Sequence, residues 1–93
     1  MRDLSELRVE IDAIDEQLMA LFEKRMRVVE EVVLYKKTHQ LEIFQPAREA
    51  IVIEKNIARL NDKELQEYAK IWLQTMMDQS KKHQQTILEK MDK

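Results

Sequence analysis

Arg25 occupies a position where an apolar residue is expected. One heptad series runs from Leu4 to Val32 and another from Leu7 to Tyr35, and together they form the apolar stripe of a long helix. Arg25 is the only charged member of either series, and the residues three and four positions from it are all apolar: Leu21, Phe22, Val28 and Val29. A buried guanidinium without a counter-ion is costly. Its partner is therefore either an acid from another segment or an anionic ligand.

Lys36 repeats this pattern eleven residues later. The two cations lie about 20° apart around a helix and about 16 Å apart along it, and no acid stands three or four positions from Lys36. Arg27 differs because glutamates lie within one turn of it, so we expect it on the solvated surface. Arg8 is intermediate, since it flanks the stripe but has Asp12 four positions on.

Neutral polar residues interrupt a second apolar stripe near the C-terminus. Ser80 and Gln84 fall at its centre, one helical turn apart. Between these helices, Arg48 and Glu49 are followed one turn later by apolar residues rather than by charges. The apolar members of the second stripe, including the tryptophan and methionines that we expect in the core, are Ala69, Trp72, Leu73, Met76, Met77, Ile87, Leu88 and Met91.

Each of these polar residues also has a structural interpretation. A buried serine or glutamine is commonly a satisfied structural group, an arginine in a stripe can set helix register, and a lysine near a helix end can extend to solvent. Together, however, three cations without local acids, beside Glu49, Ser80 and Gln84, describe a polar pocket inside a helical bundle. Its excess positive charge favours a small polyanion with two carboxylates.

A long first helix must position two of these cations. We expect it to begin at Asp3, with Glu6 completing a capping box, and to run to about Thr38. Roughly 35 residues span about 50 Å, whereas a compact chain of this size has a radius of gyration of about 13 Å. The other helices cannot cover both ends of such a helix, so the sequence predicts an intertwined homodimer in which two long helices cover each other.

Two further helices complete the expected fold. A connector over about residues 39–44 leads to Pro46, the expected first residue of a second helix that runs to about Leu60. Asn61 with Glu64 resembles a second capping box, which would open a third helix over about residues 62–91.

Composition supports an all-α class and excludes several kinds of function. The 93 residues are expected to form one domain, 1–93, and they include no glycine and one proline, so a turn-rich sheet is excluded. A net charge of −2 argues against a nucleic-acid partner. No stretch is apolar enough for a signal peptide or membrane span, which favours the cytoplasm and no membrane partner. The distant His39 and His83 predict no metal site.

The chain resembles the all-helical (type II) chorismate mutases over essentially its whole length, in a stand-alone single-domain form. The resemblance rests on residues 7–15 (LRVEIDAID), the spacing of Arg25 and Lys36, residues 46–49 (PARE) and residues 78–84 (DQSKKHQ). It implies three helices per chain, an intertwined homodimer, and two active sites that are each completed by an arginine of the other subunit.

The resemblance also implies a role for each polar residue. Arg8 matches the arginine lent across the dimer, Arg25 the one that grips a substrate carboxylate, and Lys36 and Gln84 the pair that hydrogen-bond the ether oxygen. Three further residues match substrate-binding positions. Arg48 matches a supporting cation, Glu49 the acceptor for the ring hydroxyl, and Ser80 a contact to a carboxylate.

Gln45 departs from the family pattern, which usually has an aspartate before the proline. Glutamine is a poor N-cap and carries no charge. A contact between Gln45 and the substrate hydroxyl would therefore need the amide to reach where a carboxylate normally does.

The implied reaction suits these residues. Conversion of chorismate to prephenate, a step toward phenylalanine and tyrosine, is a concerted pericyclic shift that needs no cofactor, nucleophile or proton transfer. The enzyme must hold the reactive conformer and stabilise the negative charge that develops on the ether oxygen.

Two other functions remain open from the sequence. Isochorismate-pyruvate lyase, an enzyme on the same fold, uses a similar cationic pocket, although Glu49 favours the mutase. A non-catalytic helical dimerisation module would instead pair the cations with acids across the interface.

Overall fold

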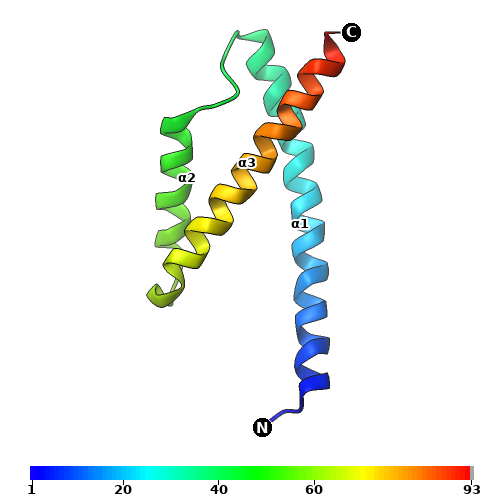
Figure 1. The fold of residues 1–93 in the computed structure, drawn as a ribbon, viewed down its shortest axis with the longest axis vertical. Helices are drawn as coiled ribbons and strands as arrows, with labels where there is room; N and C mark the ends of the chain where they lie inside the picture. The colour runs from blue at the N-terminus through cyan, green and yellow to red at the C-terminus, as the bar shows by residue number, and fades with distance from the viewer. Residues whose placement is uncertain (93) are drawn as a thin grey trace.

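The computed structural model describes residues 1–92, which are almost entirely helical (Figure 1). The sequence-based prediction of an all-α chain with a long first helix is confirmed. The elements in chain order are α1 (Leu4–Thr38), α2 (Pro46–Ala58), the short 3-10 helix η1 (Lys63–Leu65) and α3 (Gln66–Met91). Within the described residues, no helix is both long enough and apolar enough to cross a membrane.

Helix α1 forms without interruption because its 35 residues include neither glycine nor proline. The Asp3 carboxylate accepts a hydrogen bond from the Glu6 backbone N–H at 3.0 Å, so the predicted N-cap is confirmed. Lys36 and Lys37 in the last turn complement the negative end of the helix dipole. Gln40, with a φ of 56°, then turns the chain into the connector.

Helix α2 begins at Pro46, as predicted. The preceding Gln45 does not cap the helix with its side chain, and its amide instead donates to the Glu42 carbonyl at 2.7 Å. The helix ends at Ala58, two residues before the predicted Leu60.

The start of the third helix differs from the prediction. Asp62, not Asn61, is the capping residue, and its carboxylate accepts from the Glu64 N–H at 3.0 Å. A cap that bonds only two residues ahead favours a tight turn, so η1 precedes α3 and the α-helix begins at Gln66.

Helix α3 crosses the molecule diagonally and contacts both α2 and the C-terminal half of α1 (Figure 1). The buried apolar residues are Val29, Val33 and Met77, and they lie where α1 meets α3. Trp72 and Met91, both expected in the core, are instead exposed in the single chain, because the other residues of the described part, 1–92, leave much of these two side chains uncovered.

The N-terminal half of α1 extends away from the other helices (Figure 1). The chain measures 56 × 27 × 14 Å and has a radius of gyration of 16.8 Å, against about 13 Å for a compact chain of this size. The predicted heptad stripe is left open to solvent, and its exposed members include Leu4, Ile11, Ile14, Leu21 and Val28. A large part of the apolar surface is therefore unburied within one chain.

Replacing Val33 with alanine should lower the free energy of unfolding by about 1.5–3 kcal/mol, because two buried methyl groups are lost and a cavity remains. Val33 is 0% exposed, whereas Val9, on the same helix, is 68% exposed. Val9→Ala is the matched control, since it makes the same change in helix propensity. Urea unfolding followed by circular dichroism measures both, and equal effects would contradict the assignment of Val33 to the core.

Candidate active site

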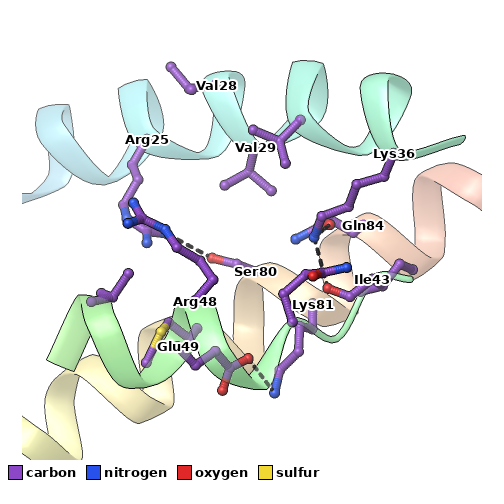
Figure 2. A pocket seen from close by; sticks show the side chains of 14 residues that line it. Arg25, Val28, Val29, Lys36, Ile43, Arg48, Glu49, Ser80, Lys81 and Gln84 are labelled. Carbon is purple, nitrogen blue, oxygen red and sulfur yellow. Dashed lines mark hydrogen bonds and ion pairs between the residues drawn. The ribbon is translucent and has the colours of Figure 1, made fainter. Parts of the chain in front are cut away.

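A cavity of about 270 Å³ lies where all three α-helices meet (Figure 2). Helix α1 forms one wall, α3 forms the floor, and the start of α2 with the connector closes the opposite side. The lining combines aliphatic side chains with charged and amide groups, as small-molecule sites commonly do. The polar lining residues are Arg25, Lys36, Gln45, Arg48, Glu49, Ser80, Lys81 and Gln84.

The partner that Arg25 lacks on its own helix comes from α3, and it is neutral. Arg25 Nη1 donates to Ser80 Oγ at 3.0 Å, while the Ser80 hydroxyl donates to the Met76 carbonyl at 2.9 Å. Burial lowers the pKa of Arg25, and the nearby Arg48 lowers it further. The Ser80 hydroxyl thus orients the guanidinium without neutralising its positive charge.

Lys36 is held at the other end of the cavity. Its ammonium donates to Gln84 Oε1 at 3.0 Å and to the Ile43 backbone carbonyl at 2.8 Å (Figure 2). Burial lowers the pKa of Lys36, and the charge of Glu49 partly offsets this effect. Because Gln84 uses its oxygen to accept from Lys36, its amide nitrogen is the group that can donate to a ligand.

The cavity carries excess positive charge. Within residues 1–92, no carboxylate lies within ion-pair distance of Arg25, Lys36 or Arg48. Figure 2 shows Arg48 extending from α2 toward Arg25, which brings two guanidinium groups to the same end. Like charges held together without an acid favour a bound anion, and a guanidinium is well suited to bind a carboxylate.

Glu49 is the cavity's only carboxylate within the described part of the chain. Its two oxygens contact different residues of α3: Lys81 Nζ lies 2.9 Å from Oε2, and Gln74 Nε2 donates to Oε1 at 3.2 Å. Sequence analysis missed both partners. A search for cations without local acids does not find Lys81, because Asp78 stands three positions before it, and that contact also forms, at 3.2 Å.

Outside the cavity, a further polar contact joins α1 to α3. His83 Nε2 lies 2.8 Å from Glu30 Oε2, and the same oxygen accepts from Arg27 at 2.7 Å. Arg27 is thus a surface residue paired with a local glutamate, as predicted. Like the contact of Arg25 with Ser80, this contact joins α1 to α3, so it helps to fix the register of the two helices.

The sequence-predicted site residues fall into two groups. Arg25, Lys36, Gln45, Arg48, Glu49, Ser80 and Gln84 all line the cavity. Arg8 does not: it is exposed on the overhanging half of α1, seventeen residues before Arg25, or about 25 Å along the helix. Within one chain, Arg8 cannot reach the cavity.

This arrangement can bind and orient an anion. It offers two guanidinium groups at one end, an ammonium and an amide at the other, and a carboxylate acceptor to one side (Figure 2). Such fixed donors can stabilise negative charge that develops on a bound molecule.

Comparison with known proteins relates the sequence to one family. Residues 7–85 match the family described as chorismate mutase type II. The chain is 41% identical over 54 residues to the T-protein of Haemophilus influenzae, an alignment covering 58% of this chain and 14% of that protein. It is also 41% identical over 61 residues to the bifunctional chorismate mutase/prephenate dehydratase of Aquifex aeolicus, covering 66% of this chain and 17% of that protein.

The chain thus spans between about one seventh and one sixth of the length of these curated relatives. No solved structure matches it significantly.

Proposed function

We propose that the protein is a chorismate mutase, because the chain belongs to the chorismate mutase type II family and its cavity has the charges and donors that this reaction requires. The reaction converts chorismate, a dicarboxylate, to prephenate in the biosynthesis of phenylalanine and tyrosine. Residues 1–93 are proposed to act as one domain, without a cofactor, in the cytoplasm.

The observation that carries this proposal is the pairing of Lys36 with Gln84. These residues come from α1 and α3, stand 48 positions apart in the sequence, and meet at 3.0 Å on the cavity wall. An ammonium and an amide held side by side on the cavity wall can form a preorganised site for developing negative charge on oxygen. Arg25 at the other end can hold a carboxylate, so that a ligand binding both ends would be restrained along its length.

In the proposed mechanism, binding selects the reactive conformer and electrostatics lower the barrier. Arg25 and Ser80 hold one carboxylate, and Arg48 supports them with a second positive charge. Lys36 and Gln84 donate to the ether oxygen, whose negative charge grows as the C–O bond breaks and the new C–C bond forms. Donors that bind the transition state more strongly than the substrate raise the turnover rate.

Two residues are proposed to bind the ring hydroxyl. Glu49 is proposed to accept a hydrogen bond from this hydroxyl, and the position of its carboxylate on the side of the cavity opposite α1 supports this role (Figure 2). Gln45 lines the same cavity, but its amide donates to the Glu42 carbonyl, so its contact with a substrate would be secondary.

Arg8 is proposed to complete the site of a second subunit. The exposed apolar stripe of α1 and the exposed Trp72 are what support a homodimer, because each offers apolar surface for another chain to cover. Two α1 helices wound around each other would carry Arg8 away from its own cavity and toward that of the partner.

The mutase is favoured over its rivals by the features of the cavity. Glu49 favours the mutase over isochorismate-pyruvate lyase. Arg25, Lys36 and Arg48 have no acid partner within residues 1–92, which argues against a purely structural module. Incubation with chorismate and with isochorismate, followed by product identification, separates the two enzymes. Failure to bind an oxabicyclic dicarboxylate that mimics the transition state would favour the structural module.

Loss of chorismate absorbance is the direct test, and Lys36→Ala gives it residue-level meaning. Removing one such donor should lower turnover by about 10²–10³-fold. Lys37→Ala is the matched control, because Lys37 is the next residue of α1 but pairs with Asp92 outside the cavity. A Lys36→Ala protein that keeps its rate would remove Lys36 from the mechanism.

Gln84→Glu should make the reaction dependent on pH. An amide donates at every pH, whereas a carboxyl at this position donates only when protonated. The variant should therefore be most active at acid pH and lose activity as the carboxyl ionises. Turnover measured across pH checks this, with the parent protein as reference; identical profiles would show that residue 84 does not face the ether oxygen.

Arg8→Ala and Arg25→Ala test the shared site. Each variant alone should be nearly inactive. After the two are unfolded and refolded together, about half of the dimers should be mixed, and each mixed dimer has one site with both arginines intact. About a quarter of parental activity should return. If native mass spectrometry shows mixed dimers and no activity returns, the intertwined site is wrong.

A further inference from the structure

Lys81 is a fourth cation of the cavity, and the proposed reaction leaves it without a role. It lies on α3 between Ser80 and Gln84, and its side chain is 26% exposed. Its ammonium sits 2.9 Å from Glu49, 3.2 Å from Asp78 and 4.6 Å from the centre of the Phe44 ring. A lysine bound on three sides is fixed in place rather than free in solvent.

These contacts close a ring of four side chains between α2 and α3. Lys81 bridges Glu49 and Asp78, and Gln74 Nε2 bridges the same two carboxylates at 3.2 and 3.0 Å. Glu49, whose side chain is 15% exposed, is thereby drawn away from α1 (Figure 2). The hydrogen bond and charge of Glu49 in turn raise the pKa of Lys81, so the lysine is charged at neutral pH.

The position of Glu49 matters because its charge reaches Lys36. Glu49 partly offsets the effect of burial on the pKa of Lys36, although the two groups do not form an ion pair. With Lys81 absent, the attraction between Glu49 and Lys36 would be opposed only by the weaker bond from Gln74. A carboxylate that moved onto Lys36 would occupy the ammonium needed to stabilise an anion.

We propose that Lys81 is a positioning residue that anchors Glu49 on the α2 side of the cavity and so keeps Lys36 free to act on the substrate. The inference rests on the proposed function. It assigns Lys81 no contact with the substrate, so all of its effect should pass through Glu49.

Lys81→Met tests this, because it removes the charge but keeps an unbranched stem beside Phe44. We expect kcat/KM to fall by about 10–100-fold, as for other losses of positioning, with part of the loss in kcat since Lys36 is affected. Lys81→Arg should restore most of the activity. Lys82→Met is the matched control, an identical change at the neighbouring exposed residue, and it should leave the rate unchanged.

The decisive comparison places Lys81→Met in a Glu49→Gln background. If Lys81 acts through Glu49, Lys81→Met should cause no further loss in the Glu49→Gln protein. The Glu49→Gln protein itself is expected to turn over slowly. Equal fold losses in both backgrounds would overturn the proposal, because Lys81 would then act on its own. No loss in the parent background would overturn it as well.

Two further measurements test the role of Lys81 without relying on the Lys81 substitutions alone or on a measurable turnover rate. Asp78→Asn, which weakens the hold on Lys81 from outside the cavity, should give a smaller loss with the same dependence on Glu49. Where turnover is too slow to measure, the affinity for the oxabicyclic dicarboxylate, measured by calorimetry, allows the same comparison of the parent, the two single variants Lys81→Met and Glu49→Gln, and the double variant. An inactive parent protein would refute the proposed function itself, whereas an active parent without coupling refutes only the role of Lys81.

Discussion

A half-buried guanidinium paired with a hydroxyl instead of a carboxylate is the constraint around which this chain is organised. Arg25 needs a partner that orients it without cancelling its charge, and Ser80 meets that need from another helix. The contact requires α3 to cross α1 at one register, which the His83–Glu30 contact on the same helix pair supports. The same crossing brings Gln84 to Lys36. A single helix crossing therefore sets both ends of the cavity.

The three helices divide the chemistry among them. Helix α1 supplies Arg25 and Lys36, and α3 supplies the neutral groups that orient them together with a further cation, Lys81. Helix α2 supplies the remaining guanidinium and the cavity's only carboxylate within residues 1–92. Because all the functional side chains except that of Gln45 stand on regular helices, their positions depend on packing rather than on loop conformation. The connector contributes through its backbone, since the Ile43 carbonyl accepts from Lys36.

Much of this could be predicted from the sequence, because heptad spacing directly reports which helical face is apolar. Arg25, Lys36, Ser80 and Gln84 stood out as exceptions within such faces, and all four line the cavity. Lys81 could not be found in this way, since its partner Glu49 is 32 residues distant and a local acid masked it. The cap at Asp62 rather than Asn61 depended on a choice between adjacent residues that both favour caps. Trp72 was expected in the core because periodicity identifies an apolar face but not the chain that covers it.

The uncovered stripe of α1 has a consequence for how the protein's activity depends on its concentration. In the proposed homodimer, folding and association would be one equilibrium, so stability would depend on the concentration of the chain. Dilution would then reduce the folded fraction, and with it the activity per molecule. Synthesis of the chain and its dilution by cell growth would then change the total activity in two ways: they would change the number of chains, and they would change the fraction of chains that is assembled into dimers.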